Sequence, residues 1–240
     1  LMSAGLALPK RVFGHGFMLS RGEKMSKSLG NVLDPFDLAD EFGVDQLRYF
    51  MLRETTFGAD GNYSEEAIIN RTNADLANDL GNLAQRSLSM IAKNCDAAVP
   101  EPGVLTAEDQ AILARVDGLM RDARAAMDQQ AIKVYLDAVW SAVADANRYF
   151  AGEEPWTKKK TDPARMATIL YVTAECVRQF AILAQPATPD AAAKLLGLLA
   201  RSDDERDFAH LGETGRLKPG TPLPKPEGVF PRYVREAAAG

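Results

Sequence analysis

Cysteine and histidine are scarce in this chain of 240 residues, which contains two of each. Cys95 and Cys176 lie far apart and neither belongs to a Cys-x-x-Cys pair, a spacing that disfavours both a zinc site and a disulfide. We expect the two thiols to pack as small apolar side chains, and we predict no metal site in this chain. The low cysteine count favours a cytoplasmic location.

The sequence also lacks an excess of positive charge. Its net charge is −5, so it is not a generally basic nucleic-acid binder, and any contact with RNA must come from a local face. We expect no apolar run long enough to span a bilayer, and residues 1–5 lack the basic-then-apolar form of a signal peptide. Apolar residues are ample for the core of one large domain or two small ones.

One short stretch concentrates lysines and hydroxyl groups between two glycines. This lysine loop reads Gly22-Glu23-Lys24-Met25-Ser26-Lys27-Ser28-Leu29-Gly30-Asn31. Because glycine accepts backbone angles that other residues resist, the stretch predicts a mobile loop and not the interior of an element. Two ammonium groups three residues apart can converge on a polyphosphate, while serine hydroxyls and backbone amides add hydrogen bonds. For a generic pair of lysines, a solvated basic turn is the commoner interpretation.

The segment before the lysine loop predicts a single short strand. Residues 8–14 form its approach, and residues 15–19 continue toward the loop. We expect no partner strand within the chain, because an unpaired apolar strand would be an exposed edge. The remaining strands of the sheet should therefore lie upstream of residue 1.

Residues 34–63 predict a small α/β connector. Asp34 followed by Pro35 is a typical helix start, with a capping carboxylate and proline at the first helical position. Residues 44–53 alternate apolar and charged faces at helical spacing, and Tyr63 fits a short strand.

From Ser64 onward the sequence predicts an antiparallel bundle of amphipathic helices joined by short loops. Ser64, Thr106, Asp162 and Thr188 are the expected caps. The expected helices span residues 64–94, 106–129, 131–150, 163–185 and 189–200. Prolines are frequent between residues 218 and 231, which predicts an extended tail that ends in a short helix near residues 233–238.

Two surfaces of this bundle could contact RNA. On the 64–94 helix, 100° spacing places a predicted core face of Ile69, Leu76, Leu80, Leu83, Ser87 and Ile91 opposite Asn78, Asn82, Gln85 and Arg86. Amide and guanidinium groups suit base edges, although such a face is more often simply solvated. Trp156, with three lysines at 158–160, could stack on an unpaired base, or it could seal the end of the bundle as a core residue.

These motifs together resemble a known enzyme family. The string Lys24-Met25-Ser26-Lys27-Ser28, with His15-Gly16 before it and residues 30–35 after it, resembles the signature loop of class I aminoacyl-tRNA synthetases. Within that class, Asn82-Leu83-Ala84-Gln85-Arg86 and Glu154-Pro155-Trp156 resemble the anticodon elements of methionyl-tRNA synthetases. Asn147-Arg148-Tyr149 also resembles that pattern, and the tail Val229-Phe230-Pro231-Arg232 is similar to the family's C-terminal segment, which folds back toward the catalytic domain.

The resemblance implies roles for individual residues. Lys24 and Lys27 would be catalytic, and Asn82, Arg86 and Trp156 would contact the anticodon. The implied ATP-binding set is His15, Met18, Lys24, Met25, Ser26, Lys27 and Ser28. The implied substrates are methionine, ATP with Mg²⁺, and tRNA(Met). The family's His-x-Gly-His string, its methionine pocket and its zinc-binding insertion do not occur in this sequence, so we expect a catalytic N-terminal half upstream of residue 1, without which this chain is inactive.

The resulting fold prediction is mainly α. Residues 1–33 would end a Rossmann-type catalytic domain, 34–63 form a stem-contact connector, 64–210 an antiparallel anticodon-binding helix bundle, and 211–240 a tail packing back toward the catalytic domain. Two alternatives stay open at this point: another class I synthetase for an aliphatic amino acid, and a non-catalytic helical tRNA-binding module.

Overall fold

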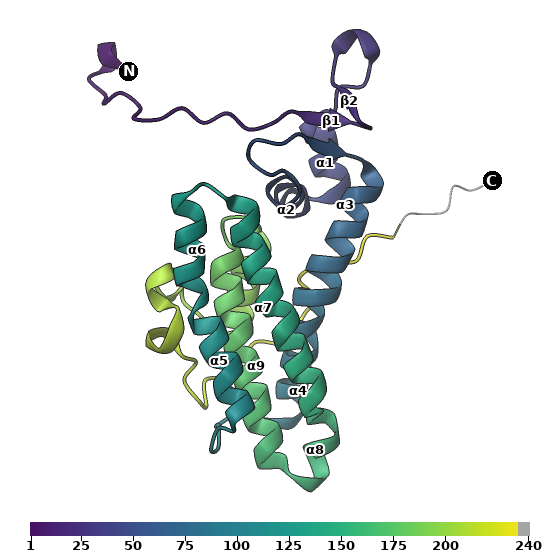
Figure 1. The fold of residues 1–240 in the computed structure, drawn as a ribbon. Coiled ribbons are helices and arrows are strands. Elements are labelled where there is room, and N and C mark those ends of the chain that lie inside the picture. Colours follow the sequence, from purple (N-terminus) through teal and green to yellow (C-terminus); the bar gives the residue numbers. More distant parts are fainter. Residues whose placement is uncertain (235–240) are drawn as a thin grey trace, which may run out of the picture.

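A small sheet at one end and a long helical bundle at the other make up the chain, described over residues 1–234 in a computed structural model (Figure 1). The predicted helix near residues 233–238 lies largely outside the described residues. The strands are β1 (Met18–Ser20), β2 (Glu23–Lys24) and β3 (Gly61–Tyr63). The α-helices are α1 (Pro35–Phe42), α2 (Val44–Glu54), α3 (Glu65–Arg71), α4 (Asn82–Asn94), α5 (Ala107–Asp117), α6 (Leu119–Asp128), α7 (Ile132–Glu153), α8 (Pro155–Thr161), α9 (Pro163–Ala184) and α10 (Pro189–Leu198). A π-helix, η3 (Thr72–Gly81), joins α3 to α4, and the 3₁₀ turns are η1 (Met2–Ala4), η2 (Lys27–Leu29), η4 (Asp203–Glu205), η5 (Phe208–His210) and η6 (Gly212–Gly215).

The strand before the lysine loop does find partners within this chain. β1 pairs antiparallel with β2 and parallel with β3, which gives the order β2-β1-β3. The prediction that β1 has no sheet to join here was therefore wrong. Its partners are two and three residues long, too short for periodicity to reveal, and β2 lies inside the stretch predicted as loop. The expected strand at Tyr63 is confirmed.

Most predicted helix starts are confirmed by capping hydrogen bonds. Asp34 accepts the N–H of Phe36 at 2.8 Å, Ser64 accepts that of Ala67 at 3.1 Å, and Asp162 accepts that of Arg165 at 3.0 Å. Thr106 and Asp109 form a reciprocal capping box. The predicted cap at Thr188 is wrong, because its hydroxyl bonds to the Ala184 carbonyl of the preceding helix.

The start of α10 is capped from another helix instead. Asp45 of α2 accepts the N–H of Ala191 at 2.6 Å and that of Asp190 at 3.4 Å. A second difference concerns the helix predicted over 106–129, which breaks at Gly118 into α5 and α6. A third is the short helix α8, which fills the interruption expected around Trp156.

The long helix from Ser64 to Asn94 is continuous, but its register changes along its length. The predicted core positions Leu76, Leu80, Leu83, Ser87 and Ile91 are all fully buried. Ile69 is only half-buried, and Ile68 is the fully buried residue in its place. The cause is the π-helix, whose wider turns offset the preceding residues from the spacing of an ideal α-helix.

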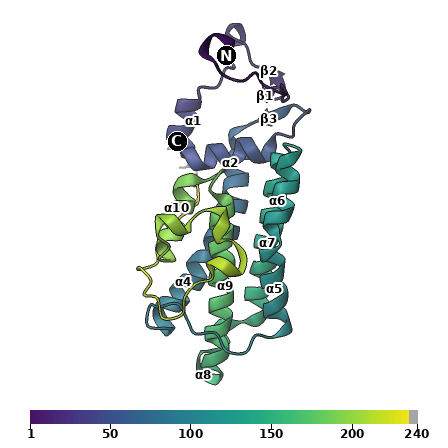
Figure 2. The same ribbon diagram turned by 90° about the vertical axis from the view of Figure 1, so that its left-hand side faces the viewer.

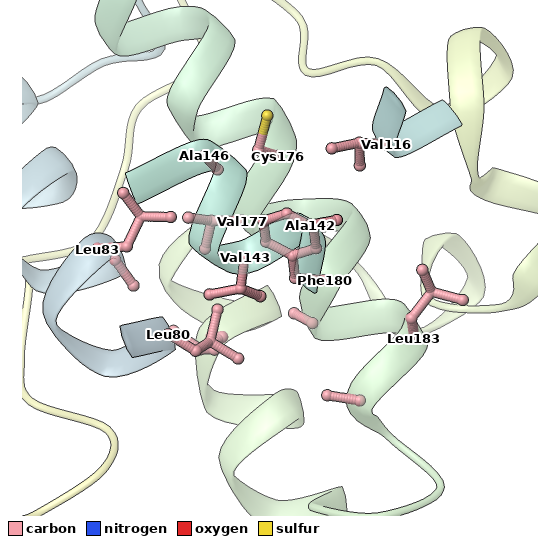
Figure 3. Packing of buried hydrophobic residues seen from close by; sticks show 14 of the residues in the cluster. Leu80, Leu83, Val116, Ala142, Val143, Ala146, Cys176, Val177, Phe180 and Leu183 are labelled. Atoms are coloured by element: carbon pink, nitrogen blue, oxygen red, sulfur yellow. The ribbon is translucent and has the colours of Figure 1, made fainter. Parts of the chain in front are cut away.

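Helix α9 lies at the centre of the bundle (Figure 2). It is buried along nearly its whole length, and the bundle core is centred on it. Figure 3 shows Val177 and Phe180 of this helix packed against Val143 of α7 and Leu80 of the π-helix. A second, smaller core joins α1, α2, β3 and α3; it consists of Leu38, Phe42, Phe50, Tyr63 and Ile68.

Helix α9 also corrects the prediction that no apolar run could span a bilayer. By length and composition it passes that test, with a mean hydropathy of 1.3, yet 94% of the relevant window is buried inside the protein. It carries the buried ion pair Glu175–Arg178, with 3.0 Å between Oε2 and Nη2. These features are those of a core helix. Cys176 is buried beside them, Cys95 is half-buried against the same core, and both thiols are unpaired.

Candidate functional site

The lysine loop begins with a tight hairpin. Arg21 and Gly22 both have positive φ, 52° and 81°, which is the geometry of a two-residue type I′ turn between β1 and β2. The loop then closes through η2, which ends at Gly30 with φ 65°. Glycine therefore occupies the positive-φ position at the end of η2 and one of the two in the hairpin turn.

Asn31 ties the two ends of the lysine loop together. Its Oδ1 accepts the N–H of Ser26 at 2.8 Å, and its Nδ2 donates to the carbonyl of Lys24 at 3.3 Å. The hydroxyls of Ser26 and Ser28 lie 2.6 Å apart, so both can turn toward one acceptor. The residues between Lys24 and Asn31 thus form a closed loop that presents two hydroxyls and two ammonium groups.

The two lysines of the loop differ in their surroundings. The ammonium of Lys24 lies 4.7 Å from the centre of the Phe17 ring, a cation–π contact that holds it beside the sheet. Lys27 is exposed and forms no ion pair with the described residues. Met25 is half-buried, as expected for a side chain that anchors the loop.

His15 and Met18 line a different, mainly apolar cleft of about 300 Å³. Phe57 forms another wall, with its ring edge-on to that of His15 at 6.4 Å. Gly16 is pressed against the backbone of Ala59, where an added Cβ would lie 2.0 Å from the carbonyl oxygen. The structure thus groups His15 with Met18, and it groups the two lysines with the two serines. Phe17, which lies between His15 and Met18 in the sequence, contacts Lys24.

Helices α4 and α8 lie at the end of the molecule opposite the sheet (Figure 1). Arg86 of α4 and Trp156 of α8 are in contact there. The guanidinium carbon lies 5.2 Å from the centre of the Trp156 ring and 5.0 Å from that of Phe150, and the two rings are 5.9 Å apart. Trp156 is 43% exposed while Phe150 is fully buried. Trp156 is therefore not a buried core residue, and its ring has surface available for stacking.

Asn82 and Arg86 lie one turn apart on α4, and both are exposed. Asn78 is exposed and Gln85 half-buried, so the predicted polar face of this helix is confirmed as a surface. We call Asn82, Arg86 and Trp156 the reading face. It offers an amide, a guanidinium and an indole ring, the groups that bind base edges and stack on bases.

A buried ionic cluster holds the corner that carries Trp156. Asp109 on α5 is fully buried and accepts hydrogen bonds from Tyr149 on α7 and Arg165 on α9, the latter at 2.9 Å from Nη2. Arg165 also pairs with Glu153 at 2.8 Å. Burial alone would raise the pKa of Asp109, but these hydrogen bonds outweigh it and lower that pKa.

Sequence reasoning missed two residues of these sites. Phe150 appeared only as the last residue of a predicted helix, and nothing in the pattern showed that it supports both Arg86 and Trp156. Asn31 was quoted within a motif, without its part in closing the loop. A helical-wheel comparison of Phe150 with Arg86 could not have found the contact, because the two residues lie on different helices.

Comparison with known proteins gives a consistent result along the chain. Residues 1–88 match the family described as tRNA synthetases class I (M), and residues 99–239, more than half of the chain, match the anticodon binding domain of methionyl tRNA ligase. The chain belongs to the methionyl-tRNA synthetase family. Another class I synthetase for an aliphatic amino acid is set aside by this match.

Similar proteins span more sequence than this chain does. Methionine–tRNA ligase of Rhizobium meliloti is 64% identical over 99% of this chain, and that of Mycobacterium tuberculosis is 55% identical over 97%. The chain spans 46% and 45% of these two relatives, slightly under half of their length. The solved structure of Mycobacterium tuberculosis methionyl-tRNA synthetase in complex with methionyl-adenylate has a TM-score of 0.91 and 55% identity, over 96% of this chain and 46% of that one.

Proposed function

We propose that this chain supplies the lysine loop and the anticodon-reading part of a methionine–tRNA ligase. The observation that carries the proposal is the contact of Arg86 with Trp156, two residues 70 positions apart that the family resemblance assigns to one anticodon. The match of residues 99–239 to a methionyl anticodon-binding domain supports the same role. tRNA(Met) is the partner this implies, and the cytoplasm is the proposed location.

The complete enzyme would join methionine to ATP, release pyrophosphate and pass the methionyl group to the terminal ribose of tRNA(Met). The methionyl-adenylate bound to the Mycobacterium tuberculosis relative supports this sequence of steps. In the first step the carboxylate of methionine attacks the α-phosphate, so the protein need supply no nucleophile. Charge builds on the phosphate oxygens as pyrophosphate departs, and preplaced cations stabilise that charge.

Lys27 is the proposed principal cation at that step, with Lys24 assisting. Ser26 and Ser28 would donate hydrogen bonds to the triphosphate, and Met25 would anchor the loop. His15 and Met18 would contact the adenosine, a role that their shared cleft and its apolar walls suit. Mg²⁺ would accompany the triphosphate.

The domain limits proposed from the sequence are kept: residues 1–33, 34–63, 64–210 and 211–240. The second candidate function, a non-catalytic tRNA-binding module, shares the reading face and lacks only the part played by the lysine loop. Both candidates predict that the chain binds tRNA. They differ in whether adenylate formation by a complete enzyme depends on Lys27.

The test of the reading face is a binding titration of this 240-residue chain with tRNA(Met) and with the same tRNA carrying an altered anticodon. We expect tighter binding of the CAU anticodon. Trp156→Ala should weaken that binding by about 1–3 kcal/mol through lost stacking. The control is Lys225→Ala, at an exposed position in the tail, which should leave tRNA binding unchanged. Trp140→Phe is unsuitable as a control because Trp140 is buried. Equal affinity of the native chain for both tRNAs would contradict the proposal.

A further inference from the structure

The helix that carries Asn82 and Arg86 of the reading face is not a regular α-helix. Its central ten residues, Thr72–Gly81, form a π-helix, with hydrogen bonds from residue i to residue i−5. This segment ends at Gly81, immediately before Asn82. The direction in which Asn82 and Arg86 point is therefore fixed relative to α3 and the sheet by the register of the π-helix.

Gly81 is required at its position. An added Cβ would lie 2.7 Å from the carbonyl oxygen of Leu76, five residues earlier, and 3.3 Å from Cβ of Phe230 in the tail. The first contact is with backbone, which cannot move without changing the helix. The second shows that the tail closes over the same spot, where Phe230 is buried.

The tail also contacts the other end of the π-helix. The N–H of Tyr233 donates to Oδ1 of Asn73 at 2.9 Å, and Nδ2 of Asn73 donates to the Tyr233 carbonyl at 3.0 Å. Tyr233 further donates its hydroxyl to Glu41 of α1 at 3.0 Å. Phe230 and Tyr233 thus brace the two ends of the π-helix from outside, and Tyr233 connects it to α1, the first helix after the lysine loop.

From the bundle side, α7 satisfies carbonyl groups of the same segment. Trp140 donates its Nε1–H to the Asp75 carbonyl at 2.9 Å, and Asn147 donates to the Asp79 carbonyl at 3.3 Å. Irregular helical turns leave carbonyl groups whose partners must come from side chains when they are buried. Asn147 belongs to the Asn147-Arg148-Tyr149 string singled out in the sequence, and this contact gives it a role.

We propose that the π-helix is a positioning element for anticodon recognition, with Gly81, Phe230 and Asn147 as positioning residues. By holding the register of α4, they set Asn82 and Arg86 at the spacing from Trp156 that adjoining nucleotides require. The proposal rests on the proposed function. None of the three residues has to touch RNA for it to hold.

The test compares Gly81→Ala with Gly197→Ala, whose added methyl group on α10 would meet nothing within 4 Å. Each variant of the 240-residue chain is titrated with tRNA(Met) and with the same tRNA carrying an altered anticodon. Gly81→Ala should weaken binding of the CAU anticodon about tenfold, the size of one lost base contact, with no change for the altered anticodon. Gly197→Ala should keep the native ratio of the two affinities, that for the CAU anticodon divided by that for the altered anticodon.

A second pair of variants covers the case in which Gly81→Ala does not fold, as judged by circular dichroism. Phe230→Ala should lower the ratio of the affinity for the CAU anticodon to that for the altered anticodon. Phe230→Leu, which restores apolar volume, should recover most of this ratio. An unchanged ratio in a folded Gly81→Ala chain, or in Phe230→Ala if the former is unfolded, overturns the positioning role. If the native chain itself shows no anticodon preference, it is the proposed function that fails.

Discussion

Arg86 illustrates how a single residue can be kept available for a ligand. Its guanidinium contacts the rings of both Phe150 and Trp156, and it forms no ion pair with the described residues. A cation over two aromatic faces is attracted by their quadrupoles, while its N–H groups remain unused. An ionic partner would have to be displaced before Arg86 could bind a base or phosphate, whereas these rings leave its donors open.

Lys27 supports a sharp prediction at the same scale. In the complete enzyme, Lys27→Ala should lower the rate of adenylate formation about a hundredfold or more, because it removes a preplaced charge that acts mainly in the transition state. The affinity for ATP should change much less. Pyrophosphate-exchange kinetics measure both quantities.

The matched control for that experiment is Lys159→Ala, an exposed lysine on α8 at the far end of the molecule. It should leave pyrophosphate exchange unchanged, since this reaction needs no tRNA. A Lys27→Ala enzyme that differs from the native one in ATP affinity alone would rule out the proposed role.

Candidate site residues could be named from the sequence only where the local pattern is distinctive. The lysine loop and the candidates Asn82, Arg86 and Trp156 could be named because each lies in a short string with distinctive chemistry. Phe150 and Asn31 could not, since an apolar residue in a helix and an asparagine after a glycine are ordinary. Their roles depend on contacts with other segments, which local pattern does not encode.

Individual elements were predictable where their signals are local. The caps at Asp34, Ser64 and Asp162 are examples, because the capping side chain and its partner lie within three residues. The pairing of β1 with β2 and β3 and the π-helix were missed. The β1–β2 hairpin is local, but its strands are too short to show a pattern. The other two depend on tertiary contacts: the β1–β3 pairing on residues about 40 positions apart, and the π-helix on the tail and α7.

The corner between α5, α7 and α9 gives a prediction at the scale of elements. Asp109→Asn should lower the free energy of unfolding near neutral pH by about 3 kcal/mol, the low end for a broken buried ion pair, because Arg165 keeps Glu153. The folded-state pKa of Asp109 is lowered, so its stabilising effect is complete above the ordinary carboxyl value of about 3.9 and is lost as pH falls through the folded value.

Urea unfolding at a series of pH values measures this difference. The gap between the native chain and Asp109→Asn should be constant above about pH 5 and shrink as the pH falls below about 4. Asp122→Asn, at an exposed ion pair with Arg121, should change stability by less than about 1 kcal/mol at any pH. A gap that stays constant down to the acid transition would show that the Asp109 carboxylate is not the source of the effect.

At the scale of the whole molecule, α2 joins the two cores. Tyr49 belongs to the bundle core and Phe50, the next residue, to the smaller core near the sheet, and both are fully buried. Arg48 donates to the Pro186 carbonyl at 2.8 Å, and Asp45 caps α10. Helix α2 therefore joins the bundle core, which carries the reading face, to the smaller core near the sheet that carries the lysine loop.

Asp45→Ala tests that connection, because alanine removes both acceptor oxygens. The buried carboxylate accepts two backbone N–H groups at the start of α10, so its loss should cost about 1–2 kcal/mol, the usual value for removing a helix cap. Hydrogen exchange of the Ala191 amide should accelerate. Amides in the centre of α9 should accelerate only as far as the loss of global stability requires. Asp190→Ala, exposed in the same turn of α10, is the matched control and should have little effect. If both variants accelerate exchange at Ala191 equally, the cap from α2 does not hold these two parts together.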